Sequence, residues 1–240
     1  MTNSSFLCLP LTRIHEVCYV LPRVCYPGMR PMINKGRGMI QAIVFDIGGV
    51  LLRTEDRTPR QQWEAQLGLP PGGAEALVFN SEMGRKAQCG EISEKALWRW
   101  ISQHLNLSAE ETADFRTGFW AGDAMDMELV RFIRRLKSQY QTAVISNYAD
   151  NLRPELTEKF GIADAFDEIV ISCEEKIMKP DPEIFHRTLA RLGRAPDEAV
   201  FIDDFKHNVA AAEAVGLAAI HFQPGIDLIL ALQKLGVSSG

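Results

Sequence analysis

Five short, mostly apolar runs constrain the fold of this chain more than any other feature. They lie at 42–45, 142–145, 168–171, 199–202 and 217–221, and each is followed by turn-forming or helix-like sequence. Runs of this length and composition are typical of strands that are buried on both faces of a parallel sheet. Their alternation with helical patterns predicts an α/β fold, namely a Rossmann-like, doubly wound parallel sheet with helices on both faces.

The interval between the first two predicted strands is too long for a simple crossover. Apolar residues recur with helical spacing throughout it, and Ser108 and Glu111 have the spacing of a capping box; the helical patterns lie at 61–67, 74–79, 93–105 and 108–120. We therefore predict a helical cap at 58–124, inserted into a core formed by 39–57 and 125–240. An insertion after the first strand would hang over the carboxyl ends of the strands, where a lid belongs.

The first 38 residues differ in composition from the rest. They hold five of the 26 basic residues but one of the 31 acidic residues, and prolines and charges interrupt their apolar pieces. Such a segment neither spans a membrane nor forms a clean signal peptide. We expect a disordered extension, or a natural start at Met39 just before the first strand, and a basic organellar presequence is the alternative.

Charge and cysteine content narrow the functional class. The net charge of -5 argues against a general nucleic-acid surface. The five cysteines form no CxxC pair and are odd in number, which indicates a reduced, cytoplasmic protein. We expect a small-molecule partner and no membrane, while the oligomeric state is left open.

Two polar motifs at strand ends can handle a phosphoryl group. Asp46 follows the first strand and precedes Gly48 and Gly49, so its carboxylate sits on a sharp turn and can attack phosphorus or carbon. Ser146 and Asn147 end the second strand with a hydroxyl, an amide and backbone N–H groups that can hold phosphate oxygens. For both motifs, the capping of a neighbouring turn or helix is the alternative role.

Two further motifs supply charge. Lys179, stiffened by Pro180, can offer a positive charge to a phosphate and a carboxylate, although a lone lysine is usually solvated. Asp203 and Asp204 end the fourth strand, and adjacent acids repel unless they share a cation. Oxygen ligands from Asp46 and Asp204 suit Mg²⁺, whereas a helix cap is the alternative role for one of the two acids.

The four motifs in this order resemble the haloacid dehalogenase (HAD) superfamily of hydrolases, in its version with a helical cap after the first strand. The resemblance covers about residues 40–235. Its most specific parts are the run Lys179–Phe185 and the pattern Asp-Asp-x-x-x-Asn-x-x-Ala-Ala-x-x-x-Gly at Asp203–Gly216. The chain is most similar to the branch that contains the N-terminal phosphatase domain of soluble epoxide hydrolases and bacterial sugar-phosphate phosphatases.

The resemblance implies a magnesium site. Asp46 would be the nucleophile and a Mg²⁺ ligand, and the carbonyl of Gly48 would be a second ligand. Asp204 would be the third protein ligand, with Asp203 supporting it directly or through water.

The resemblance also implies a phosphoryl site. Ser146, Asn147 and Lys179 would bind the transferring group, and Asn208 would orient the acidic loop. The expected substrate is a small phosphorylated metabolite, such as a sugar or acyl phosphate, hydrolysed through an aspartyl-phosphate.

Gly48 departs from the phosphatase pattern of the family, which has a second Asp two residues after the nucleophile. That Asp would protonate the leaving alcohol, and positioned acid–base catalysis contributes roughly 10²–10⁴-fold. Three readings follow: a phosphatase for substrates with good leaving groups, a metal-independent enzyme that attacks carbon as dehalogenases do, or a binding module with little activity. The intact Asp203 and Asp204 favour the first.

Other polar or aromatic residues carry weaker signals. The five histidines show no metal-ligand spacing, so we expect them to be ordinary surface or core residues. Trp98 and Trp100 lie in a helical pattern and are expected to pack in the cap. The loop Cys89–Glu91, with Arg85 and Lys86, is the predicted place where the cap selects substrate.

Overall fold

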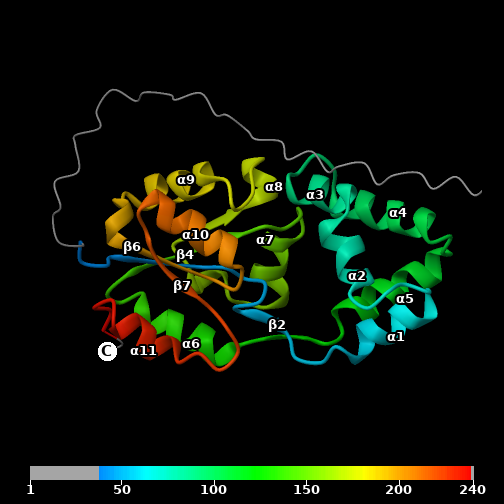
Figure 1. Cartoon of the computed structure of the whole chain (residues 1–240), viewed down its shortest axis with the longest axis horizontal. Coiled ribbons are helices and arrows are strands. Elements are labelled where there is room, and N and C mark those ends of the chain that lie inside the picture. Colours follow the sequence, from blue (N-terminus) through cyan, green and yellow to red (C-terminus); the bar gives the residue numbers. More distant parts are fainter. Residues whose placement is uncertain (1–37, 239–240) are drawn as a thin grey trace, which may run out of the picture. The chain divides into compact units, whose positions relative to one another are not determined.

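The computed structural model describes residues 38–238, so the predicted extension at 1–38 lies almost wholly outside the described residues. Five strands form one parallel sheet in the order β5-β4-β1-β6-β7 (Figure 1). Their bounds are Ala42–Phe45 (β1), Gln141–Ser146 (β4), Glu168–Ile171 (β5), Ala199–Asp203 (β6) and Ala218–His221 (β7). The predicted α/β fold with a parallel sheet is confirmed, and the strand limits differ from the predicted ones by at most one residue.

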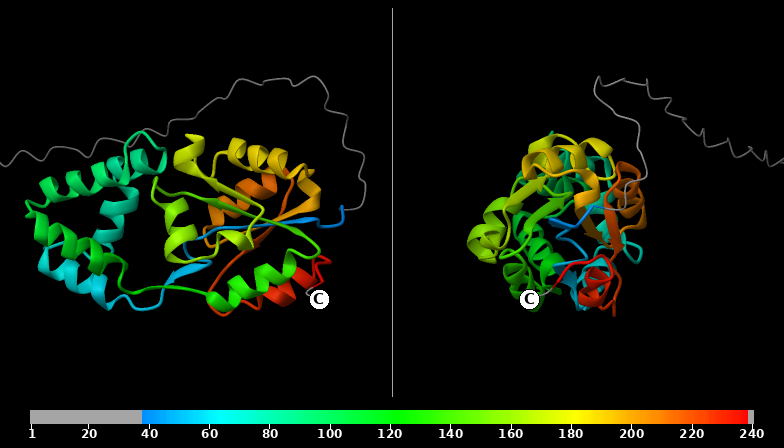
Figure 2. Two further views of the ribbon diagram at one scale, coloured as in Figure 1. Left: turned by 180° about the vertical axis from the view of Figure 1, so that it is seen from behind. Right: turned by 90° about the vertical axis from the view of Figure 1, so that its left-hand side faces the viewer.

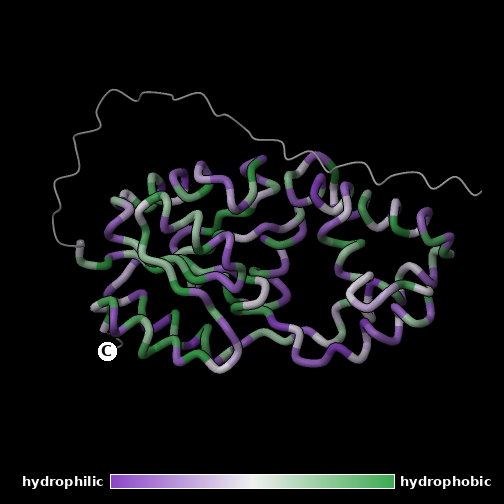
Figure 3. Tube along the Cα trace, in the orientation of Figure 1, coloured by the Kyte–Doolittle hydropathy of each residue, from purple (hydrophilic) through white to green (hydrophobic). Residues whose placement is uncertain are grey.

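Alternating side chains of the central strand point into two separate cores. Ile43 and Phe45 belong to the cluster on one face, whereas Ala42 and Val44 belong to the cluster on the other. All four are fully buried, which explains why β1 reads as a continuous apolar run. The central strands are accordingly coloured as hydrophobic along most of their length in Figure 3.

Helices cover both faces of the sheet. Helices α6 (Met127–Leu136) and α11 (Leu228–Gln233) pack on the face of Phe45, and α9 (Pro182–Leu192) and α10 (Lys206–Val215) pack on the face of Val44 (Figure 1). The core also holds α7 (Leu152–Pro154), which continues as a π-helical turn at Glu155–Lys159, α8 (Ser172–Glu175), and two 3₁₀ helices at Ala163–Ala165 and Pro196–Glu198.

Helix ends follow the capping signals of the sequence. Asp181 accepts a hydrogen bond from the Glu183 N–H (2.9 Å) at the start of α9, where Pro182 is the first helical residue. The same helix ends at Gly193, which has the left-handed φ of 64° that glycine tolerates best.

The region between β1 and α6 is helical except for two short strands. Its helices are α1 (Thr58–Gln66), α2 (Gly73–Glu75), α3 (Glu82–Gln88), α4 (Glu94–His104) and α5 (Ala109–Trp120), with a π-helical turn at Ala76–Asn80. Viewed from behind, these helices form a group of their own, here called the helical cap (Figure 2). The capping box at the start of α5 is present, because Ser108 and Glu111 each accept a hydrogen bond from the other's backbone N–H.

Strands β2 (Leu52–Thr54) and β3 (Asp123–Met125) pair antiparallel where the chain enters and leaves the cap. All residues that the structure describes fall in one compact unit, Gly36–Gly240, so the boundaries of the cap at 58 and 124 stay a prediction. No helix between residues 38 and 238 is both long and apolar enough to cross a membrane.

Candidate active site

Asp46 lies on a tight turn at the carboxyl end of β1. Its backbone N–H continues the ladder to β6 by donating to the Ile202 carbonyl (2.9 Å). The turn closes because the N–H groups of Leu51 and Leu52 both donate to the Ile47 carbonyl (2.9 and 2.8 Å). The Asp46 side chain is held in turn by the Ile47 N–H, which donates to Oδ1 (2.7 Å). The carboxylate is therefore fixed before any ligand binds.

The two glycines after Asp46 have different environments. Gly49 has φ +73°, and a Cβ built there would lie 2.2 Å from a carboxylate oxygen of Asp204, so only glycine lets the two loops approach. Gly48 is exposed, and a Cβ built on it would meet no atom within 4 Å. The place where the family's second Asp would stand is thus open space.

Lys179 is the central cation of the site and is itself almost fully buried (2% exposed). Its ammonium donates to Oδ2 of Asp46 (2.9 Å) and to Oδ2 of Asp203 (2.7 Å). Burial alone would lower the pKa of Lys179, but the two carboxylates outweigh it and raise that pKa. An ammonium has three donors, so one remains for a ligand.

Asp203 is completely buried, and both of its oxygens accept hydrogen bonds from the protein. Oδ1 accepts from the Phe205 N–H (2.8 Å), and the Asn208 amide donates to both oxygens (3.0 and 3.1 Å). Together with Lys179, these donors use the carboxylate fully. Asp203 thus closes the turn before α10 and also holds Lys179, whereas the N-cap residue of α10 is Phe205 and no side chain caps that helix.

The Asp204 carboxylate, unlike that of Asp203, is not saturated by donors from the protein. Its Oδ1 is buried but has no hydrogen-bond partner among the described residues. Its backbone carbonyl is held by the His221 ring Nε2 (2.9 Å), which fixes the loop. A buried carboxylate oxygen without a donor is costly unless a cation completes it.

Three carboxylates lie close together here, and two of them, Asp46 and Asp203, pair with Lys179. One oxygen from each of Asp46, Asp203 and Asp204 lies within 4.8 Å of the others. Burial raises the pKa of Asp46 to about 7, with Lys179 opposing the shift, and burial and the charge of Asp203 raise the pKa of Asp204 to about 6. The excess negative charge and the oxygen donors fit a hard divalent cation such as Mg²⁺.

Ser146 and Asn147 lie beside this cluster at the end of β4, and Ser146 is buried. The Asn147 side chain is already engaged with Lys179, since its amide donates to the Lys179 carbonyl and accepts from the Lys179 N–H (both 2.8 Å). The Asn147 side chain therefore positions Lys179. The predicted contact between Asn147 and a phosphoryl group would have to come from the Asn147 backbone N–H, and it stays a prediction.

Contacts between the cap and the core were not foreseen from the sequence. The Ser172 hydroxyl donates to the Gln88 carbonyl of the cap (2.6 Å) and accepts from the Tyr148 N–H (3.0 Å). Lys176 donates to the carbonyl of Gly90 (2.7 Å), within the loop predicted to select substrate. The partners are 84 and 86 residues apart along the chain, so no local pattern could reveal them.

Arg60 is a second residue that sequence reasoning missed. It is buried, donates to the Phe119 carbonyl (2.7 Å) and pairs with Asp123 of β3 (2.7 Å) and with Glu75 (2.5 Å). This network ties three parts of the cap to the strand that leads back to the core. Its only signal in the sequence is an arginine among ordinary polar residues of α1.

The family model for haloacid dehalogenase-like hydrolases matches residues 40–216, which is most of the chain. The chain belongs to this family. The predicted resemblance to the HAD superfamily is confirmed, and this HAD protein is a hydrolase.

Two curated relatives extend the family match. The sesquiterpene phosphatase astK of Aspergillus oryzae is 28% identical over 81% of this chain and 96% of its own length. Acyl-CoA dehydrogenase family member 10 of Mus musculus is 30% identical over 80% of this chain, but that match spans only 19% of the longer mouse protein.

A solved structure shows the same fold. A HAD family enzyme from Bacteroides thetaiotaomicron, in complex with magnesium and inorganic phosphate, superposes with a TM-score of 0.66. It is 22% identical, and the superposition covers 78% of this chain and 96% of that enzyme. At this level of identity the likeness supports the fold.

Proposed function

We propose that this HAD hydrolase is a Mg²⁺-dependent phosphatase that hydrolyses a phosphate monoester through an aspartyl-phosphate on Asp46. The observation that carries the proposal is the buried, unpartnered Oδ1 of Asp204 beside the held carboxylate of Asp46. The phosphatase relative from Aspergillus oryzae and the magnesium and phosphate bound to the Bacteroides enzyme agree with it.

The metal would be held by Asp46, by Asp204 and by the carbonyl of Gly48. Asp203 has both oxygens occupied by protein donors, so it acts as the residue that positions Lys179 rather than as a direct ligand. When bound, Mg²⁺ would neutralise charge on the phosphoryl oxygens and on the carboxylates.

Each residue of the site would have its own role in the reaction. Asp46 would attack phosphorus in line, and the bond from phosphorus to the ester oxygen would break. Lys179 would use its third N–H on a phosphoryl oxygen, with the Ser146 hydroxyl and the Asn147 N–H holding the others. Water would then hydrolyse the aspartyl-phosphate and regenerate Asp46.

Gly48 sets a limit on the substrate. It carries no proton for the departing alkoxide, so that proton must come from solvent, and the exposed position of Gly48 gives water access. Leaving groups that need little protonation, such as acyl phosphates, are therefore expected to react fastest.

Trapping of the covalent intermediate tests the proposal. After acid quenching of a reaction with acetyl phosphate and Mg²⁺, mass spectrometry should find one phosphoryl group on the peptide that contains Asp46. Asp46→Asn should abolish this adduct. The matched control is Asp227→Asn, which makes the same change at the N-cap of α11, where Asn can still accept the hydrogen bond, and should leave the adduct unchanged.

Turnover without any adduct on Asp46 would contradict the assigned nucleophile. Equal turnover in EDTA would contradict the assigned metal. A well-folded protein with no turnover on any ester would favour the binding-module reading instead.

A further inference from the structure

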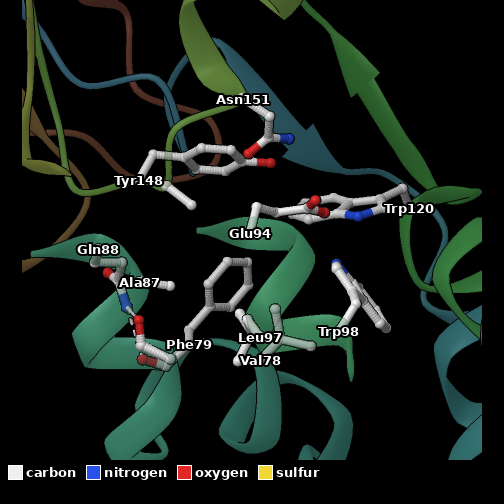
Figure 4. Close-up of a pocket in the computed structure, with 12 residues that line it drawn as sticks. Val78, Phe79, Ala87, Gln88, Glu94, Leu97, Trp98, Trp120, Tyr148 and Asn151 are labelled. Carbon is white, nitrogen blue, oxygen red and sulfur yellow. Dashed lines mark hydrogen bonds between the residues drawn. The ribbon is translucent and has the colours of Figure 1, made fainter. Parts of the chain in front are cut away.

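A buried hydroxyl, that of Ser172, lies between the helical cap and the turn at 146–148 that follows β4. Ser172 directly follows β5 and is completely buried. Its Oγ donates to the Gln88 carbonyl of the cap (2.6 Å) and accepts from the Tyr148 N–H of the core (3.0 Å). In Figure 4 the cap helix that carries Gln88 lies opposite the core segment that carries Tyr148. One side chain thus contacts both regions.

The turn at 146–148 is held at two points. The Tyr148 N–H belongs to the peptide that follows Asn147, and because Ser172 accepts from this N–H, it fixes the plane of that peptide. The Asn147 side chain holds the same turn from the other side, through the backbone of Lys179. The two groups that the proposed function assigns to the phosphoryl oxygens, the Ser146 hydroxyl and the Asn147 N–H, therefore lie on a turn that Ser172 helps to position.

On the cap side, Ser172 completes the end of a helix. Gln88 is the last residue of α3, and the carbonyls in the last turn of a helix need donors from outside it. The cap loop that follows packs directly on the segment after β5, since a Cβ built on Gly90 would lie 2.1 Å from the Cys173 carbonyl oxygen. Removal of the Ser172 hydroxyl would therefore leave the buried Gln88 carbonyl without its donor at a place where backbones are in contact.

Two further hydrogen bonds join the cap to the same part of the core. The Lys176 ammonium donates to the Gly90 carbonyl (2.7 Å), and the Glu94 N–H donates to Asp150 (2.8 Å). The Lys176 and Asp150 side chains are exposed, so water can replace these bonds, whereas Ser172 is buried. Ser172 is thus the contact whose loss water compensates least.

The Ser172 hydroxyl has one proton and two carbonyl acceptors within reach. The Gln88 carbonyl of the cap lies at 2.6 Å, and the Tyr148 carbonyl of the core lies at 3.3 Å. Donation in the shorter bond polarises the hydroxyl and strengthens its acceptance of the Tyr148 N–H. Contact with the cap therefore tightens the hold of Ser172 on the turn at 146–148.

We propose that Ser172 is a positioning residue that makes the phosphoryl-binding turn at 146–148 depend on the contact between cap and core. The proposal rests on the proposed function, because it takes Ser146 and Asn147 to bind the phosphoryl group. Coupling between two sites is reciprocal, so a bound phosphoryl group in turn tightens the contact between Gln88 and Ser172.

Hydrogen exchange of the wild-type protein tests the proposal without any mutation. Mg²⁺ is present throughout, and the probe is inorganic phosphate at a concentration that fully inhibits the turnover of acetyl phosphate. We expect phosphate to slow exchange about fivefold or more in the cap segment 88–94, while helix α1 at the far side of the cap stays unchanged. No added protection of 88–94 would overturn the proposal.

Ser172→Ala and Ser102→Ala form a matched pair of variants. Each removes a hydroxyl that donates to a carbonyl, but Ser102 donates to Leu107 within the cap (3.0 Å). We expect Ser172→Ala to raise the inhibition constant of phosphate about tenfold and to abolish the protection of 88–94. Ser102→Ala should change that constant less than about twofold. Equal constants in the two variants would contradict the proposal.

Gly90→Ala disturbs the same contact from the cap side. Its Cβ would collide with the Cys173 carbonyl, and it changes neither Ser172 nor the turn at 146–148. We expect Gly90→Ala to raise the inhibition constant of phosphate as well. In the double variant with Ser172→Ala the two effects should not add, because both break one contact. Strictly additive effects would show that Ser172 acts on the turn alone, without the cap, and would contradict the proposal.

Failure of this proposal is distinguishable from failure of the proposed function. If the wild-type protein does not hydrolyse acetyl phosphate, both fall together. Wild-type turnover with unchanged phosphate inhibition in Ser172→Ala overturns the role of Ser172 alone. Thermal midpoints check that each variant folds, and if Ser172→Ala does not, the wild-type exchange experiment and Gly90→Ala decide the question.

Discussion

The core and the cap of this HAD hydrolase hold their important residues in different ways. In the core, Lys179 is a buried cation, and its two carboxylate partners, Asp46 and Asp203, lie at strand ends. In the cap, the interior is a cluster of aromatic rings, with Trp98 in edge contact with both Phe115 and Phe119. The core site is thus built from charged atoms at fixed distances, whereas the cap interior is built from packed aromatic rings.

We expect the core and the cap to respond differently to substitutions. A buried ion pair fails when one partner is removed, because the other charge is stranded. An apolar wall loses contact area in proportion to what is removed. We therefore expect large effects on the rate from core substitutions, and effects on substrate preference from cap substitutions.

Asp46→Asn should give the largest effect on catalysis. The variant removes the nucleophile, and we expect kcat to fall roughly 10³-fold or more. Asn has nearly the shape of Asp, and Lys179 keeps its ion pair with Asp203, so the fold should stay intact. Phosphate release and circular dichroism would check the two halves of this expectation. A rate within tenfold of wild type would remove Asp46 from the nucleophile role.

Lys179→Met and Arg60→Met compare buried cations of the core and the cap. Each variant strands buried carboxylates, so each should lower the free energy of unfolding by about 3–5 kcal/mol. The Lys179 variant should also lose turnover, whereas the Arg60 variant should keep kcat within about tenfold because Arg60 touches no proposed reacting group. Urea unfolding and steady-state kinetics separate the two. Equal losses of kcat in the two variants would contradict the expectation that the core residue acts in catalysis and the cap residue in stability alone.

Gly48→Asp should speed the reaction on esters with poor leaving groups. The position is open, so the new carboxyl meets no atom, and positioned acid catalysis contributes roughly 10²–10⁴-fold. Acetyl phosphate, which needs little protonation, should gain much less. The matched control is Gly49→Ala, whose Cβ would collide with Asp204 and should lower activity. The same gain on alkyl and acetyl phosphate would argue against a missing acid.

Stabilisation by Mg²⁺ should depend on pH. Without metal, the folded protein has raised pKa values of about 7 for Asp46 and about 6 for Asp204, compared with 3.8 ordinarily. A raised carboxyl pKa means that the fold retains a proton that the unfolded chain has released, so stability without metal falls as pH rises from about 4 to 7. Mg²⁺ must displace these protons.

The measurement is the thermal midpoint with Mg²⁺ and with EDTA at pH 5.5 and pH 8. We expect the shift caused by Mg²⁺ to be clearly larger at pH 8, where both carboxylates are ionised. A shift that is independent of pH would mean that these carboxylates do not hold the metal.

Ser108→Ala should give the smallest effect. It removes the capping box of α5, which lies on the outer part of the cap, and should lower the free energy of unfolding by about 1 kcal/mol. Because Ser108 is exposed and lies outside the proposed phosphoryl site, kcat should stay unchanged. A lower kcat would show that the cap transmits distant changes to the active site.

The sequence predicted the core far better than the cap because local signals are stronger there. The strand β1 is a continuous apolar run, and Asp46 and Asp203 lie at the carboxyl ends of neighbouring strands, whereas Lys179 lies beyond the short helix α8 that follows β5. The strands β2 and β3 escaped prediction, since each has three residues and its partner lies about 70 residues away. Helix α3 was also missed, because it is short and contains Gly84, which weakens its helical pattern.

The hydrogen-bond partners of the site side chains could not be predicted from the sequence either. Asn147 carries an amide that suits a phosphate. Only the fold shows that this amide donates to the Lys179 carbonyl and accepts from the Lys179 N–H. The two adjacent acids look equivalent in sequence, yet Asp203 is saturated by donors and Asp204 has a free buried oxygen. The difference arises because the donors Phe205, Asn208 and Lys179 all face Asp203 and none of them reaches the buried oxygen of Asp204.

The most direct measurement is phosphate release from acetyl and octyl phosphate by the wild-type protein, with Mg²⁺ and with EDTA. Turnover that requires Mg²⁺ is the predicted result, because Asp204 and Asp46 need a cation to complete the site. Turnover that is equal in EDTA, or none at all from folded protein on either ester, would contradict a magnesium-dependent phosphatase built on Asp46.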